Sequence, residues 1–216
     1  MRFTYSIILI ACFVFTSLGQ TGFYVKYKAE FNTSSEDAEM MKTIMNGSSI
    51  EVAANANNTW VKTNMGLMMT MTMELDVELK KMTMFMTGTM GNMAFSGNTD
   101  SLKDDEEQNK TEVELIDETK KILGVNCKKA ITKDEFGNVS TYWYTENFKR
   151  PEGMKQMPSN VPGLCLQFIT ESEEFTISYT AVEFNDNAKM KDYKVVIPEG
   201  TEIKSLEEMK NMGVGG

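Results

Sequence analysis

The sequence predicts an α+β fold in which a curved antiparallel sheet carries a short helix near each end of the chain. Two observations lead to this class. Many short segments alternate apolar and polar residues and are separated by Asn, Gly and Pro, a pattern typical of strands with one buried face. Helix signals occur only near the two ends, and strands do not alternate with long helices as they do around a parallel sheet.

Residues 1–19 have the anatomy of a signal peptide. Arg2 provides a positive start, Ile7–Phe15 provides an apolar stretch, and small residues follow before the predicted cleavage. The stretch is shorter than the ~20 apolar residues that span a bilayer. Lipidation of Cys12 stays open as an alternative, although apolar residues continue past it. We therefore expect an exported protein, located in the periplasm, at the outer membrane or outside the cell, with a single domain at 20–216.

The domain is expected to begin with a strand and a helix. Gly22–Phe31 alternates aromatic or aliphatic residues with polar ones, which predicts a strand. Thr33 or Ser34 is positioned to cap a helix that Gly47 ends. Segments bounded by Asn and Gly then predict a series of strands. These are Ile50–Ala54, Thr59–Met65, Met69–Leu79, Lys81–Thr87 and Met90–Phe95.

The rest of the chain continues with strands and ends in a helix. Asn98–Asn109 is polar and acidic and predicts a solvated loop, while Arg150–Gly163 is rich in proline and predicts an irregular crossover. Ser205, with Glu208 three residues later, forms a capping box that predicts a helix starting at Leu206. The strands predicted here are Thr111–Asp117, Gly124–Thr132, Val139–Thr145, Leu164–Thr170, Phe175–Phe184 and Tyr193–Ile197.

The composition argues against several functions. The 31 acidic residues outnumber the 22 basic ones and give a formal net charge of −9. Nucleic acid is therefore a poor partner, because phosphate binding needs a positive surface. The chain has no histidine, which removes His-based nucleophilic catalysis and the usual zinc and copper(II) ligand sets. We expect no enzymatic activity, no cofactor and no metal site of these kinds.

Two cysteines remain after removal of the signal peptide, Cys127 and Cys165. In an oxidising compartment such a pair is compatible with one disulfide, which would stabilise the fold by roughly 3–4 kcal/mol in the chain-entropy description. The alternative is two free, buried thiols in neighbouring strands, because the sequence does not show whether the two Cα atoms come within bonding range.

Methionine is unusually frequent, with 19 residues, and it alternates along two predicted strands. Strand geometry places these methionines on one face and the intervening threonines on the other. Three interpretations stay open: ordinary core, a pliable surface for an apolar ligand, and copper(I) binding through thioethers. The candidate ligand-lining residues are Met69, Met71, Met73, Met82, Met84 and Met86, with Trp60 as a further candidate.

Four segments carry a resemblance to a known family. They are Leu115–Ala130, Thr141–Asn147, Val161–Phe168 and Ile197–Met212. In this order they resemble a family of exported Gram-negative proteins named for a GLPGLI motif, and a related domain of unknown function. The name motif is only partly present, since this chain reads VPGLC at residues 161–165. The resemblance implies an architecture similar to the lipoprotein carriers LolA and LolB, in which an incomplete β-barrel, or half-barrel, surrounds helices and an acyl-chain cavity.

The predicted function follows from this resemblance and from the methionines. We predict a non-enzymatic envelope protein that binds a lipid, a lipoprotein acyl chain or another apolar ligand in a Met-rich half-barrel, a function that rests on analogy of fold. Peripheral contact with a membrane is compatible with it. The alternatives are a structural or partner-binding envelope protein without a ligand, and a periplasmic copper(I)-binding protein.

Overall fold

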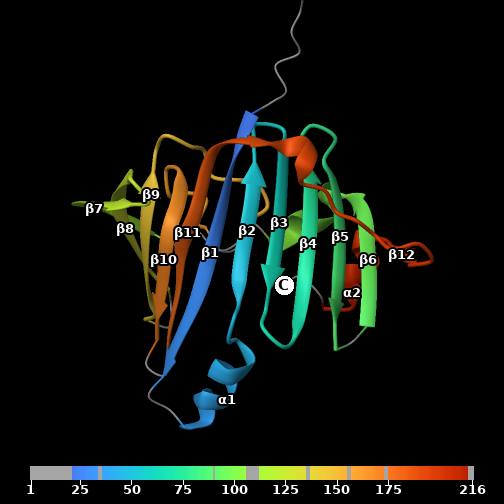
Figure 1. Ribbon diagram of the computed structural model, residues 1–216, viewed down its shortest axis with the longest axis horizontal. Helices are drawn as coiled ribbons and strands as arrows, with labels where there is room; N and C mark the ends of the chain where they lie inside the picture. The colour runs from blue at the N-terminus through green and yellow to red at the C-terminus, as the bar shows by residue number, and fades with distance from the viewer. Residues whose placement is uncertain are drawn as a thin grey trace, which may run out of the picture.

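A single open sheet organises the described part of the protein. The computed structural model describes residues 21–33, 36–89, 91–105, 112–134, 137–154, 157–172 and 175–213. These residues form a sheet of twelve strands in the order β12-β6-β5-β4-β3-β2-β1-β11-β10-β9-β8-β7 (Figure 1). The predicted signal peptide, residues 1–19, lies outside the described residues.

Two antiparallel meanders meet at the centre of this sheet. The first starts with β1 and runs outward through β2 to β6, each strand paired with the next. A short helix leaves the sheet after β1, and a 3₁₀ helix, η1, follows β6. The elements are β1 (Thr21–Thr33), α1 (Glu36–Ile44), β2 (Ser49–Ala54), β3 (Asn58–Asn64), β4 (Met69–Asp76), β5 (Lys81–Gly88), β6 (Gly91–Asn98) and η1 (Thr99–Asp105).

The second meander returns to the centre, where β11 pairs with β1 and joins the two halves. The chain then crosses back to the far edge, where the short strand β12 pairs in parallel with β6. The elements are β7 (Val113–Ile122), β8 (Val125–Lys133), β9 (Val139–Thr145), β10 (Leu164–Glu171), β11 (Phe175–Lys189), η2 (Met190–Asp192), β12 (Ile203–Lys204) and α2 (Leu206–Asn211).

The β7–β8 hairpin shows why strand ends differ from the predictions. Ile122 pairs with Val125, so only Leu123 and Gly124 form the loop, and both have positive φ, 49° and 82°. Two such residues make a type I′ turn, whose twist matches that of the flanking strands. The strand predicted to end at Asp117 therefore continues to the turn.

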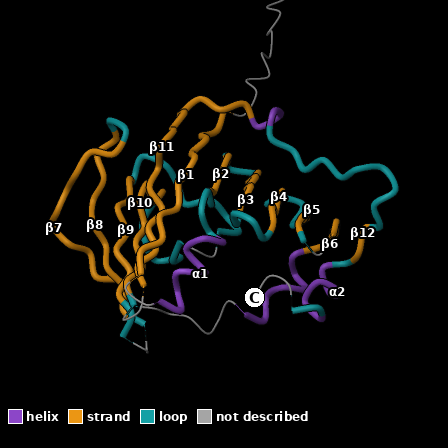
Figure 2. Tube along the Cα trace, turned by 60° about the horizontal axis from the view of Figure 1, so that its bottom comes forward, coloured by secondary structure: helices purple, strands orange, loops and turns teal. Residues whose placement is uncertain are grey.

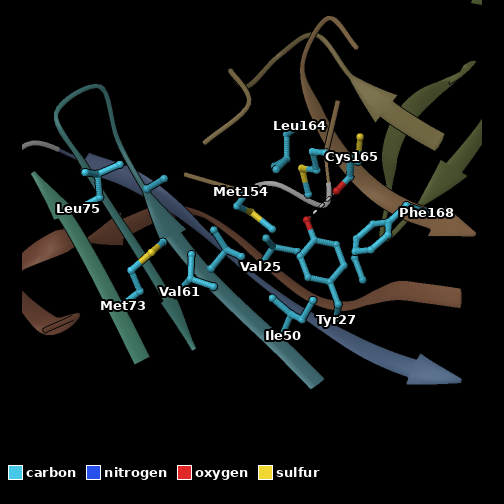
Figure 3. Packing of buried hydrophobic residues seen from close by; sticks show 14 of the residues in the cluster. Val25, Tyr27, Ile50, Val61, Met73, Leu75, Met154, Leu164, Cys165 and Phe168 are labelled. Carbon is cyan, nitrogen blue, oxygen red and sulfur yellow. Dashed lines mark hydrogen bonds between the residues drawn. The ribbon is translucent and has the colours of Figure 1, made fainter. Parts of the chain in front are cut away.

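The core lies on the concave face of the sheet. Figure 2 shows the sheet as an arch with α2 on its concave side. One row of directly paired residues crosses six strands on this face, and each member is at most 6% exposed. The row is Val25, Val52, Val61, Met73, Met84 and Phe95. Facing side chains in such a row pack against one another, and Figure 3 shows part of this packing.

Two segments close over the concave face. Leu206 and Met209 of α2 are buried, and Leu206 lies so close to Gly97 of β6 that a Cβ there would be 3.3 Å from its Cγ. The crossover between β9 and β10 buries Met154 and Met157 in the same core. It ends at Gly163, where φ is +144° and a Cβ would lie 2.1 Å from the Thr145 carbonyl oxygen. Only glycine fits this close approach.

The predicted α+β half-barrel is wrong, because the regular secondary structure of the described residues is mainly strand, in one open sheet, with two short α-helices. Helices occur near both ends as expected, but they do not form a layer inside the curve. The side chains of Met40 and Met41 on α1 are 71% and 44% exposed, so these two side chains do not pack into the core as those of a core helix do. Among the described residues, the LolA/LolB-like arrangement around helices is therefore absent.

The segment predicted as a strand at Tyr193–Ile197 is instead an extended strap that crosses the outside of the sheet. The backbone N–H of Val195 donates to the Glu74 carboxylate at 3.2 Å rather than to a neighbouring strand. Side-chain contacts thus replace the backbone ladder that would define a strand. The ladder forms only later, at β12.

Candidate functional site

The face opposite the core, called here the outer face, carries a cluster around Trp143. The row Lys129, Trp143, Gln167, Thr180 and Lys28 connects five strands through direct pairs. Residues paired in this way point to the same side of a sheet. Because Lys28 is adjacent to buried Tyr27 in β1, the row lies on the side away from the core. Trp143 is thus presented, half-buried, on the outer face, with polar side chains beside it in the row.

Two lysines and an amide hold the indole of Trp143. The Nζ of Lys120 lies 4.0 Å from the ring centroid, and that of Lys129 lies 5.8 Å away. Lys120 also donates to Gln167 Oε1, and Gln167 Nε2 donates to Thr180 Oγ1 at 2.8 Å. A cation over an indole face is favourable because the face of the ring is electron-rich. The five side chains therefore form a connected network across strands β7 to β11.

The electrostatics of this network lower the pKa of Lys120. Partial burial is the main cause that lowers the pKa of Lys120 from its ordinary value, and the like charge of Lys129 lowers it further. Lys129 has a carboxylate of its own, since its Nζ lies 3.2 Å from Glu118 Oε1. The network thus presents hydrogen-bond donors and acceptors around one aromatic ring, which is the composition of a polar binding surface.

A second aromatic cluster on the outer face is covered by the strap. Tyr24 and Trp60 are each 8% exposed. The ring of Tyr193 stacks on Tyr24 at a centroid distance of 5.5 Å and tilts over Trp60 at 5.4 Å. Trp60 pairs with Ala53 and Glu74, not with the methionine row. The sequence grouped Trp60 with the methionines, but the structure places it on the opposite face of the sheet.

The six methionines predicted as a ligand lining belong to the core. Met73, Met82, Met84 and Met86 are at most 9% exposed, and Met69 and Met71 pack against the same cluster. The crossover between β9 and β10 packs closely against the side chains of Met73 and Leu75, because a Cβ at Gly153 would lie 3.3 Å from both Met73 Cε and Leu75 Cδ2. Of the three interpretations, ordinary core describes these side chains.

Cys127 and Cys165 are both buried and free. Cys127 lies in β8 and Cys165 in β10, with β9 between them. Two strand spacings separate the Cα atoms by about 10 Å, beyond the ~7 Å that a disulfide can bridge. The predicted disulfide is therefore not formed in this structure. Burial raises the pKa of Cys165 to about 12.

The described segments also bear on metal sites and membrane spans. They contain no group of three or more Cys, Asp or Glu side chains placed to hold a metal ion. No helix within them has the length and apolar character needed to cross a membrane.

Lys120 and Gln167 were not among the site residues predicted from the sequence, and Trp143 was given no firm role. The sequence did contain a local signal for Trp143. It directly follows Tyr142 in a predicted strand, and consecutive residues of a strand face opposite sides of the sheet, so one of the two rings had to lie on the outer face. No local signal identified its partners, because Lys120 and Gln167 reach it only through the pairing of β7 to β10.

Comparison with known proteins places this geometry in context. A protein-family model described as "N-glycanase peptide, N-terminal domain" matches residues 30–206. No curated protein matches the chain. Structures of PNGF-II in space groups C2 and P21 are each 17% identical, with TM-scores of 0.49 and 0.47, and 89% of this chain is covered in both. The chain covers 32% and 33% of those proteins, about a third of their length.

A third structure is similar over nearly its whole length. An uncharacterized conserved protein from Thermus thermophilus is 10% identical with a TM-score of 0.50, covering 86% of this chain and 91% of that one. At this identity the likeness concerns the fold alone.

These findings correct the predicted family and function. The match over residues 30–206 is to an N-glycanase domain, so the resemblance to GLPGLI-type and LolA-like proteins was wrong. The lipid-binding prediction fails with it, and its methionine lining is core. Neither alternative, a ligand-free structural envelope protein or a copper(I)-binding protein, is supported by the match.

Proposed function

The chain belongs to the family of N-glycanase peptide N-terminal domains, and we propose from this that it serves N-glycoprotein processing as a binding module without catalysis of its own. An N-glycanase acts on N-linked glycans, so a domain of this family has a glycoprotein as its natural partner. Since function resides in a site rather than in a fold, the proposal needs a surface that can bind one.

The Trp143 cluster is the observation that carries the proposal. Tryptophan is the residue type most enriched among the few that dominate binding energy at interfaces. Trp143 is half-buried on a sheet face, so its ring is held in place before any partner arrives. Partial burial of the ring against the core cluster reduces the entropy lost on binding.

The chemistry of the cluster fits a glycan attached to a protein. An indole offers an apolar surface to the C–H groups of a sugar ring. Lys120 donates and Gln167 both donates and accepts, which matches sugar hydroxyls and acetamido groups. Lys120 has a flexible stem, so it can move off the ring when a sugar stacks there.

The non-catalytic part of the proposal rests on residue types. The chain lacks histidine, and the cluster itself pairs no nucleophile with a base, the arrangement that covalent catalysis uses. The signal-peptide anatomy of residues 1–19 adds the proposal of an exported location, and the net charge of −9 keeps nucleic acid a poor partner.

Biolayer interferometry with matched ligands tests the proposal. One surface carries a glycoprotein with a single high-mannose N-glycan, and the other carries the same polypeptide without the glycan. We expect binding to the first surface to be at least ~10-fold tighter, and Trp143→Ala to weaken it by about the same factor, or ~1.4 kcal/mol. Lys120→Ala is tested in the same way, and Lys121→Ala is its matched control, because Lys121 is the exposed neighbour of Lys120 in the same strand.

Two results would contradict the proposal. Equal binding to both surfaces would show that the glycan is not recognised. Release of the glycan by the purified chain alone, seen as a mass loss of the glycoprotein, would show that the chain is an enzyme.

A further inference from the structure

A polar cavity lies at the opposite edge of the sheet from Trp143. Its volume is about 430 Å³, within the range of small-molecule sites. It lies between the outer edge of β6 and the chain that leads into β12, at the right of Figure 1. Its polar lining consists of Asn92, Glu199, Thr201, Glu202 and Lys204.

The cavity exists because β12 covers only part of β6. Ile203 and Lys204 pair with Ala94 and Phe95, and no other described residue pairs with the outer edge of β6. Beside Asn92 the strand edge therefore faces the cavity. Backbone N–H and C=O groups at a sheet edge are strong donors and acceptors that need a partner.

A tight turn forms the opposite wall. The N–H of Thr201 donates to the carbonyl of Pro198 at 3.2 Å, and Gly200 has φ +82°. A positive φ at the third residue identifies a type II turn, in which glycine is preferred. Glu199 is the second residue of this turn, and Glu202 follows directly after it. The wall is thus formed before a ligand binds, which lowers the cost of binding.

The lining side chains are available to a ligand. Within the described residues, no hydrogen bond occupies the side chains of Asn92, Glu199, Thr201 or Glu202. An amide and a hydroxyl both donate and accept, the carboxylates accept, and the ammonium of Lys204 donates. Two carboxylates against one ammonium disfavour an anion, and the described residues offer no group of three ligands for a metal.

We propose that this cavity is a saccharide-binding site, separate from the Trp143 cluster. A neutral, hydroxyl-rich ligand is the class that uses mixed donors and acceptors without requiring a net charge, because each hydroxyl both donates and accepts. The choice of an N-glycan sugar as the probe rests on the proposed function, whereas the polar chemistry of the cavity does not. The strand order places β6 and β9 toward opposite edges, so each site can be disabled alone.

Saturation-transfer NMR and calorimetry on the purified protein, with N,N′-diacetylchitobiose as the probe, test the inference. We expect the double variant Asn92→Ala/Glu202→Ala, made in a Trp143→Ala background, to weaken binding at least ~10-fold relative to Trp143→Ala alone while its melting temperature stays near that of Trp143→Ala. Glu207→Ala, an exposed carboxylate on α2 outside the lining, is the matched control and should bind as the wild type does. Trp143→Ala should also leave disaccharide binding at the cavity unchanged.

The outcomes separate the two proposals. Disaccharide binding that survives the double variant in the Trp143→Ala background, absence of disaccharide binding in Trp143→Ala, or preferential binding of a methylammonium probe would overturn the cavity inference. Loss of glycoprotein binding in Trp143→Ala with intact binding at the cavity would support both sites. Intact cavity binding with no glycoprotein binding would leave the saccharide site and remove the proposed function.

Discussion

The hydroxyl of Tyr27 donates a 2.6 Å hydrogen bond to the backbone carbonyl of Cys165, linking β1 to β10 through the core (Figure 3). Tyr27 is fully buried, and its ring meets Phe168 edge-on at 5.6 Å. A register shift between Cys165 and Gln167 interrupts the β9–β10 ladder here. A bulge of this kind leaves backbone groups without ladder partners, and the Tyr27 hydroxyl supplies one.

Replacing Tyr27 by Phe should destabilise the protein by ~1–3 kcal/mol, because the buried carbonyl loses its donor. Urea unfolding followed by fluorescence measures the loss. Tyr179→Phe is the matched control, since the ring of Tyr179 also contacts Phe168, by stacking, but its hydroxyl has no hydrogen bond within the described residues. We expect the control to change stability by less than ~0.5 kcal/mol. Equal losses in the two variants would contradict the role of this hydrogen bond.

Both thiols should be unreactive in the folded protein. Burial raises the pKa of Cys165 to about 12 and also raises the pKa of Cys127, and only the thiolate reacts with disulfide reagents. We expect no labelling of Cys127 or Cys165 by Ellman's reagent at pH 8 without denaturant, and labelling of both in guanidinium without reductant. Rapid labelling of the native protein would show that a thiol is accessible. Failure to label the unfolded protein would show that the pair is a disulfide.

The sequence predicted what depends on local periodicity. Alternation along β5 correctly assigned Met82, Met84 and Met86 to one face, and the capping box at Ser205 correctly located α2. Both signals involve residues close in sequence, so neither needs knowledge of strand order.

Features that depend on pairing were not predictable in this way. Trp60 shares its face with Glu74 rather than with Met73, because the β3–β4 register pairs Val61 with Met73. A shift of one residue would reverse this assignment. The separation of Cys127 from Cys165 depends on β9 lying between their strands, which no local pattern reveals. The Trp143 cluster likewise depends on the order of β7 to β11.

The buried methionines should contribute to stability as ordinary core residues. Met84 is 5% exposed in the row that joins β1 to β6. Met84→Ala should cost ~2–5 kcal/mol, because the side chain is lost and a cavity remains. Met40→Ala is the matched control, since this side chain is 71% exposed and its loss should change stability by less than ~0.5 kcal/mol. Urea unfolding compares the two, and a small loss at Met84 would indicate a loosely packed face.

The cap of α2 should make part of the stability depend on pH. Ser205 Oγ accepts from the Glu208 N–H at 3.1 Å, and the Ser205 N–H donates to Glu208 Oε2 at 2.8 Å. The hydrogen bond from the Ser205 backbone is the main cause that lowers the pKa of Glu208 from its ordinary value of 4.5. Around and below pH 4.5 the unfolded chain therefore binds this proton more readily than the folded chain. The stabilisation is present above the unfolded value and is lost as the pH falls through the folded value.

Urea midpoints at pH 7 and pH 3 for the wild type and Glu208→Gln measure this effect. The amide in this variant keeps a cap that does not titrate, so the wild type should lose more stability on acidification than the variant, with all other carboxylates common to both. Ser205→Ala, which removes the acceptor at the helix start, should cost about 1 kcal/mol at pH 7. Parallel pH profiles for the wild type and Glu208→Gln would mean that the Glu208 carboxylate does not stabilise α2 through its charge.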